Sequence, residues 1–146
     1  MTDYTSSLDE VPVGRSDDSI GRWVCKKLTF TATTYGNQGT HNLITIPANN
    51  FVAMGFFAVT TSLVSDSNNG TIQFLAAEAL CAAHTADGTE LAAKDVVTLS
   101  TGDYDTTAGK QTYNTAADTV DITVATNDIT AGAGYLIVLL IDLTNE

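Results

Sequence analysis

The side chains in this sequence that could carry catalysis or bind metal ions do not follow the spacings of a known catalytic or metal-binding motif. The two histidines, His41 and His84, do not lie in an HExxH, HxH or comparable spacing that brings metal ligands onto one face. The sequence also has no nucleophile motif of the GxSxG type. We therefore predict one loop histidine and one partly buried histidine, no catalytic residue, no metal site and no cofactor.

A pair of carboxylates is the next candidate. Asp103 and Asp105 stand two residues apart in the segment TGDYDTTAG and have the residue types of an acid–base couple. Carboxylates at this spacing in a threonine-rich loop more often form a solvated turn. We expect a turn here and predict that the protein is not an enzyme.

A calcium-like pattern occurs at residues 66–70. Asp66, Asn68 and Gly70 follow the order D-x-N-x-G, which supplies oxygen ligands and a tight turn. An EF-hand loop would place a bidentate glutamate at its twelfth position, where this sequence has Ala77. The pattern therefore predicts a turn held by side-chain-to-backbone hydrogen bonds.

The two cysteines, Cys25 and Cys81, lie far apart and form no CxxC motif. This spacing argues against a zinc site, a dithiol redox motif and a dense disulfide framework. We expect two reduced and mostly buried thiols.

The basic residues are concentrated near the start of the chain. Four of the six cations, Arg15, Arg22, Lys26 and Lys27, surround Trp23, in a chain whose net charge is -11. This asymmetry predicts a partner-binding surface in which the cations face an acidic partner and Trp23 is an apolar anchor. The alternative is that Trp23 fills the edge of the fold and the cations neutralise nearby aspartates.

Length and charge limit the remaining classes of function. The 146 residues form one domain, and the net charge of -11 repels both a phosphate backbone and an anionic bilayer. The longest apolar run, residues 135–141, is too short to span a bilayer. We expect neither a nucleic-acid nor a membrane partner. Only 16% of residues are charged, which indicates that partners cover much of the surface.

The elements that must position these residues are mainly strands. Threonine occurs 24 times, proline only twice, and several segments alternate apolar and polar residues. Strands are predicted at residues 23–34, 42–46, 51–64, 71–75, 95–100, 119–126 and 135–143. Gly55 indicates a bulge or close backbone approach, residues 66–70 a hairpin-like connection, and residues 76–88 a short helix or irregular loop.

This pattern predicts an all-β fold, an antiparallel β-sandwich or jelly roll of about seven or eight strands. The sandwich domain covers residues 22–146 and follows an extended N-terminal arm, residues 1–21, whose acidic composition favours disorder in solution. The last predicted strand is almost continuously apolar. It is therefore either a central strand covered on both faces or a strand that meets a neighbouring subunit.

From Ile44 onward the sequence resembles small virion proteins of tailed bacteriophages. The resemblance lies in the segments TIPANNFVAMGFFAVTTSLV, NNGTIQFL and AADTVDITVATNDITAGAGYLIVLLIDL, and covers roughly the last hundred residues. It implies a β-sandwich subunit of the capsid decoration, cement or head-fibre type, located on the capsid surface. Its partners would be the major capsid protein and further copies of itself, commonly in a homotrimer.

Two other roles remain open. The same sandwich serves in tails and head–tail junctions, because a fold does not fix a role. A carbohydrate-binding, receptor-binding sandwich would instead line a shallow groove with aromatic side chains, for which Tyr104, Tyr113 and Trp23 are the candidates.

Overall fold

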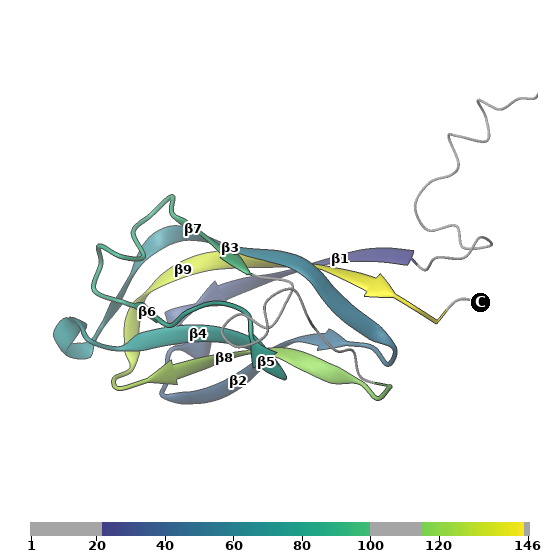
Figure 1. Ribbon diagram of the computed structural model, residues 1–146. Coiled ribbons are helices and arrows are strands. Elements are labelled where there is room, and N and C mark those ends of the chain that lie inside the picture. Colours follow the sequence, from purple (N-terminus) through teal and green to yellow (C-terminus); the bar gives the residue numbers. More distant parts are fainter. Residues whose placement is uncertain (1–21, 100–114, 145–146) are drawn as a thin grey trace, which may run out of the picture.

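Two antiparallel β-sheets face each other in the computed structural model, which describes residues 22–99 and 115–144 (Figure 1). The elements in chain order are β1 (Arg22–Thr31), α2 (Ala32–Tyr35), β2 (Gly39–Ile46), β3 (Asn50–Ser65), the 3-10 turn η1 (Asp66–Asn68), β4 (Thr71–Ala76), β5 (Glu78–Ala79), β6 (His84–Thr85), β7 (Val96–Leu99), β8 (Asp118–Ala125) and β9 (Ile129–Asp142). The predicted arm, residues 1–21, lies outside the described residues.

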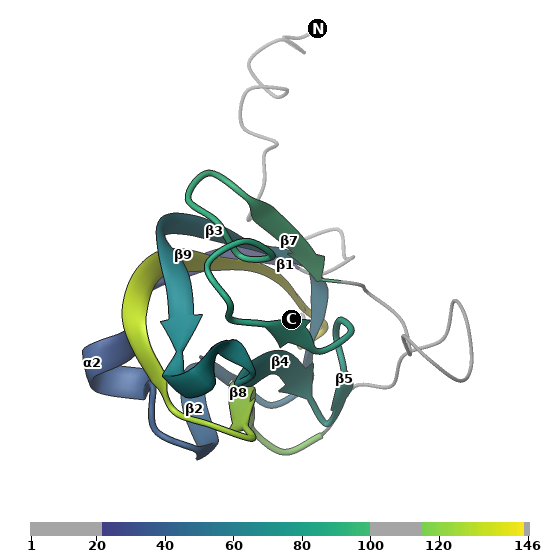
Figure 2. The same ribbon diagram turned by 90° about the vertical axis from the view of Figure 1, so that its left-hand side faces the viewer.

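The strands form two layers. One sheet has the order β1-β9-β3-β7, and the other has the order β2-β8-β4-β5, with β6 also paired to β4 (Figure 2). We call them the β9 sheet and the β8 sheet after a central strand of each. This arrangement confirms the predicted all-β antiparallel sandwich. The chain enters and leaves it at one end, where Arg22 is paired with Asp142.

Successive long strands belong to different sheets, and this corrects the prediction for residues 66–70. The connection does not close a hairpin, because β3 pairs with β9 and β7 while β4 pairs with β8. It crosses from one layer to the other through η1, with Ser67 and Asn68 at positive φ. The Asn-Gly dipeptide correctly marked a turn, but a turn signal does not say which strands it joins.

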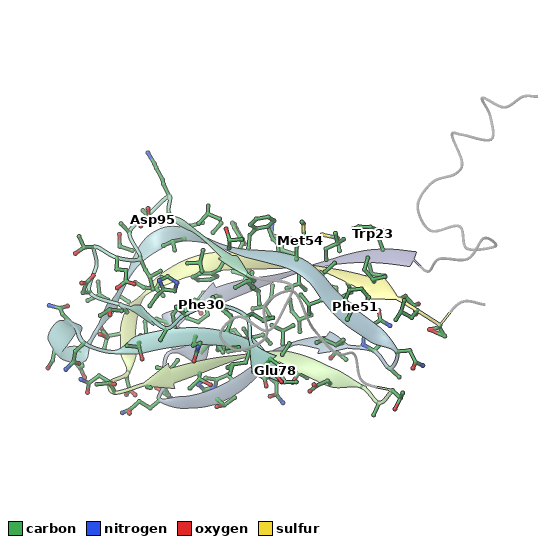
Figure 3. The ribbon with its side chains drawn as sticks, in the orientation of Figure 1. Trp23, Phe30, Phe51, Met54, Glu78 and Asp95 are labelled. Atoms are coloured by element: carbon green, nitrogen blue, oxygen red, sulfur yellow. The ribbon has the colours of Figure 1, made fainter. Side chains whose placement is uncertain are left out.

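The core fills the space between the layers, where Phe30 is seen between the sheets in Figure 3. The ring of Phe57 lies 5.6 Å from that of Phe30 and 5.1 Å from that of Phe74, which belongs to the opposite sheet. All three side chains are fully buried. These aromatic contacts therefore tie the two layers together.

Gly55 is a close-approach position, as predicted. A Cβ placed there would lie 3.0 Å from a methyl carbon of Leu99 and 3.1 Å from the carbonyl oxygen of Ile137. The change of register in this part of β3 falls between Val52 and Met54, just before the glycine.

The first predicted strand ends earlier than its alternation suggested. The Thr31 side chain accepts a hydrogen bond from the Thr34 amide and caps the short helix α2. The helix is followed by Gly36, and only a glycine fits there because a Cβ would lie 2.2 Å from the Ile129 carbonyl oxygen. Residues 76–88 take the irregular form of the two predicted alternatives, with only the two-residue strands β5 and β6.

Candidate functional site

The two histidines have separate partners. His41, on β2, has its Nε2 atom 2.7 Å from the Asn37 carbonyl oxygen. His84, on β6, has its Nδ1 atom 2.9 Å from Oε2 of Glu90. Both are partly buried and both lie on strands, so the predicted partly buried histidine is found and the predicted loop histidine is not. Within the described residues, no group of three or more histidine, cysteine or acidic side chains is placed to hold a metal ion.

Glu90 fastens the loop that contains β6. Its Oε1 atom accepts a hydrogen bond of 3.0 Å from the Thr85 amide, while Oε2 meets His84. The Thr85 amide, with a smaller contribution from His84, lowers the pKa of Glu90 below its usual value. The amides of Thr89 and Glu90 both donate to Asp87 Oδ1 at 2.8 Å. These contacts hold an exposed loop in shape.

The calcium-like segment is held by its own hydrogen bonds. The Gly70 amide donates to Ser65 Oγ at 2.7 Å, and that hydroxyl donates to the Ala86 carbonyl at 2.8 Å. A Cβ on Gly70 would lie 2.6 Å from the Asn127 carbonyl oxygen, which accounts for the glycine. The predicted turn with side-chain-to-backbone bonds is confirmed.

Four sequence-based candidates, Asp103, Asp105, Tyr104 and Tyr113, lie outside the described residues, as does Arg15. No helix in the described ranges is long and apolar enough to cross a membrane.

The cysteines differ from each other. Cys81 is buried, as predicted, and burial raises the pKa of its thiol. Cys25 is exposed, which corrects the prediction of two mostly buried thiols. The reason is the period of β1, where Cys25 follows Trp23 on the side facing away from the core.

The same period divides the predicted basic cluster. Trp23, Cys25 and Lys27 are exposed on one side of β1, whereas Lys26 lies on the other side and is half-buried. The Lys26 ammonium donates to the Thr45 carbonyl oxygen of β2 at 3.0 Å, across the flank where the two sheets meet. The two neighbouring lysines therefore belong to different surfaces.

The outer face of the β9 sheet carries the largest set of exposed apolar side chains among the described residues. Trp23 is 53%, Met54 43% and Val96 57% exposed. Figure 3 shows Trp23 and Met54 projecting from the same side of the sheet. We call this surface the apolar face. Its apolar members by register and alternation are Trp23, Cys25, Phe51, Met54, Phe56, Val96, Tyr135, Ile137, Leu139 and Ile141.

The members of the apolar face lie in cross-strand rows. Trp23 is opposite Ile141, which is opposite Phe51. In the next row, Cys25 and Met54 lie on either side of Leu139 of β9. Directly opposed side chains project from the same face of a sheet, so the rows form a continuous apolar surface.

One cation lies within the apolar face, and it already has a partner there. The Lys27 ammonium stands 4.1 Å from the centre of the Tyr135 ring, a cation–π contact. No carboxylate belongs to the rows. At the ends of the sheet, Asp95 accepts a hydrogen bond from the Ala92 amide and Asp142 accepts one from the Thr144 amide.

The outer face of the β8 sheet has a different composition. Along β8, buried residues such as Ile122 and Val124 alternate with threonines that point outward. The hydroxyls of Thr40 and Thr123 lie 3.1 Å apart across the strands, and the Thr119 hydroxyl donates to Asp121 at 2.6 Å. Some polar groups of this face are thus bonded within one chain, and the two outer faces of the sandwich are chemically unlike.

No protein-family model matches the sequence, and no curated protein matches it significantly. Solved structures do share the fold. A chain in the capsid of Ralstonia phage GP4 superposes with a TM-score of 0.61 at 16% identity, covering 93% of this chain and 94% of that one. A chain in the acidic stable capsid structure of Helicobacter pylori bacteriophage KHP30 gives a TM-score of 0.59 at 16% identity, covering 84% and 90%.

A third match is a chain in the capsid asymmetric unit of cyanophage Pam1, with a TM-score of 0.51 at 15% identity and coverage of 92% and 95%. The similarity extends over nearly the whole length in each case. At the level of fold, these matches confirm the predicted resemblance to β-sandwich proteins of bacteriophage virions.

Proposed function

We propose that this protein is a structural, non-enzymatic component of a bacteriophage virion, located on the capsid surface, where it binds and stabilises the shell as a decoration or cement protein. The observation that carries this proposal is the similarity in fold, over 84% and 93% of this chain, to chains of phage capsid structures. A sandwich with one apolar and one threonine-rich outer face also suits a protein that works through its surfaces.

The strand order supports the same class of protein. The long strands pass alternately between the β9 sheet and the β8 sheet, and the first and last strands pair with each other. We assign this path to the jelly-roll type of winding, which recurs in viral capsid domains.

The proposed partners are the major capsid protein and further copies of this chain in a homotrimer. A subunit that binds only the assembled shell stabilises it by its free energy of binding, summed over all copies. A trimer would add avidity because its subunits attach together.

The test uses phage heads purified without this protein. Adding the full chain is expected to give saturable co-sedimentation with the heads and to raise the temperature at which they break. A reconstruction of the decorated heads should then show the sandwich on the outside of the shell. Density at the tail or the head–tail junction, or the absence of binding, would overturn the decoration role.

The basic cluster supplies a second test. We propose that Arg15, Arg22 and Lys26 face an acidic surface of the shell; of these, Lys26 lies on the flank beside the apolar face. Charges at the rim of an interface act mainly on the association rate and are screened by salt over about 10 Å at 0.1 M. Lys26→Glu should therefore slow binding at low salt, whereas Lys94→Glu, the same change on a distant loop, should reduce the rate less.

A further inference from the structure

The apolar face has no partner within the described part of the chain. Its exposed residues alternate with fully buried ones such as Leu136, Val138 and Leu140, so the strands that form it are already packed on their inner side. The largest apolar patch on a folded domain is often a functional surface that contacts another molecule.

We propose that the apolar face is covered by other copies of this chain, so that it is the contact surface of the homotrimer proposed above, on which this inference rests. The first argument is charge. Each copy has a net charge of -11, so two copies repel each other through most of their surface. The apolar face, with no carboxylate in its rows, is where they can meet without bringing carboxylates together.

The second argument concerns Lys27, the one cation that the described residues place on this face. Its ammonium rests on the Tyr135 ring of the same chain, 4.1 Å from the ring centre. The cation is thus partly satisfied before any partner arrives. A face built for an acidic partner would present free cations, whereas this one presents apolar side chains and fits a surface of the same kind.

The area of the apolar face limits the strength of the contact. Four strands about 4.8 Å apart, with side chains over about 20 Å of strand length, give roughly 300–500 Å² per copy. Two such faces bury roughly 600–1,000 Å², which is less than the roughly 1,200–2,000 Å² of stable interfaces. Three faces around one axis bury roughly 900–1,500 Å² in total, but three contacts share this area, so each contact is small and association is expected to depend on protein concentration.

The experiment measures the mass of the full chain by sedimentation velocity from about 1 to 100 μM. Met54→Glu places a carboxylate in the middle of the face, and Thr45→Glu adds the same charge to the outer side of β2. A carboxylate buried in an apolar contact without a partner is expected to weaken association at least 100-fold. The wild type and Thr45→Glu should form trimers, while Met54→Glu should stay monomeric.

A second measurement uses Cys25, which is already present on the face, as the probe. Cys25 is exposed in one copy and lies in the same row as Met54, so its reaction with a maleimide reports whether the face is covered. In the wild type the rate should fall as protein concentration rises. The rate for Met54→Leu should follow the wild type, because the apolar surface is kept.

The possible failures are distinguishable. If Met54→Glu folds, as judged by circular dichroism, and still forms trimers, the copies meet elsewhere; the inference is then wrong while the trimer stands. If Cys25 reacts at one rate at all concentrations and is protected only when heads are added, the face belongs to the shell. That result overturns the inference and leaves the decoration role intact.

Discussion

The packing of the two sheets against each other can be tested at the contact between Phe57 and Phe74. Phe57 lies on β3 and is fully buried between Phe30 and Phe74, with ring centres at 5.6 and 5.1 Å. Its neighbour Phe56 is on the opposite side of the same strand and is 37% exposed. The two phenylalanines therefore form a matched pair that differs in position but not in chemistry.

Replacing Phe57 by alanine removes a buried ring and leaves a cavity between the sheets. Such changes lower the free energy of unfolding by about 3–5 kcal/mol. Phe56→Ala removes a side chain that is about two-thirds buried and leaves no cavity, which corresponds to about 1–2 kcal/mol. Because a domain of this size is stable by about 5–15 kcal/mol, Phe57→Ala should remain folded but melt roughly 10 °C lower.

The assay is equilibrium unfolding in urea, followed by circular dichroism at a concentration where the chain is monomeric. Monomeric conditions matter because association would add to the apparent stability. A double substitution of Phe57 and Phe74 should show a coupling of about 0.5–1.5 kcal/mol, since both rings are lost from one contact. Equal losses for Phe57→Ala and Phe56→Ala would refute the assignment of the inner and outer sides of β3.

Three further outcomes follow from the structure. Gly134→Ala should destabilise the fold by about 1–3 kcal/mol, because the new Cβ would lie 2.8 Å from the Phe57 ring. The same urea assay measures this loss, and unchanged stability would contradict the packing of Gly134 against Phe57. The pKa of Glu90 is lowered in the folded protein, so its hydrogen bonds stabilise the fold above pH 4.5, the usual pKa of a glutamate. This stabilisation is lost as the pH falls through the lowered pKa. The melting temperature of Glu90→Gln should therefore depend less on pH in that range than the melting temperature of the wild type. Mass spectrometry after brief iodoacetamide treatment of the monomer should show modification of exposed Cys25 and not of Cys81, whose raised pKa and burial both slow the reaction.

The strands were predictable because their signal is local. Alternation at residues 119–126 and the long β-rich run at residues 51–64 anticipate β8 and β3, which the structure places at Asp118–Ala125 and Asn50–Ser65. Pairing between strands was not predictable in the same way. Residues 66–70 contain a strong turn signal, but whether a turn closes a hairpin or crosses between sheets depends on contacts with distant strands.

The candidate site shows the same limit at the level of single residues. Four cations around Trp23 suggested one basic surface, yet a strand sends adjacent side chains to opposite faces. Lys26 therefore reaches the Thr45 carbonyl on the flank, while Lys27 lies over Tyr135 on the apolar face. The alternation was visible in the sequence, but the strand's exact extent and the partner ring were set by pairing with β9.

The almost continuously apolar strand β9 was the one signal in the sequence that pointed to the apolar face. Such a strand is either covered on both sides within its own chain or completed by a neighbour. The structure places β9 between β1 and β3, with residues such as Leu140 packed in the core and Ile141 on the outer side. Among the described residues, only the inner side of β9 meets a second layer. The outer face of the β8 sheet, by contrast, carries threonines, as expected of a sheet face that is exposed to water. The contrast between the two faces is why we assign the outer side of β9 to contact between copies.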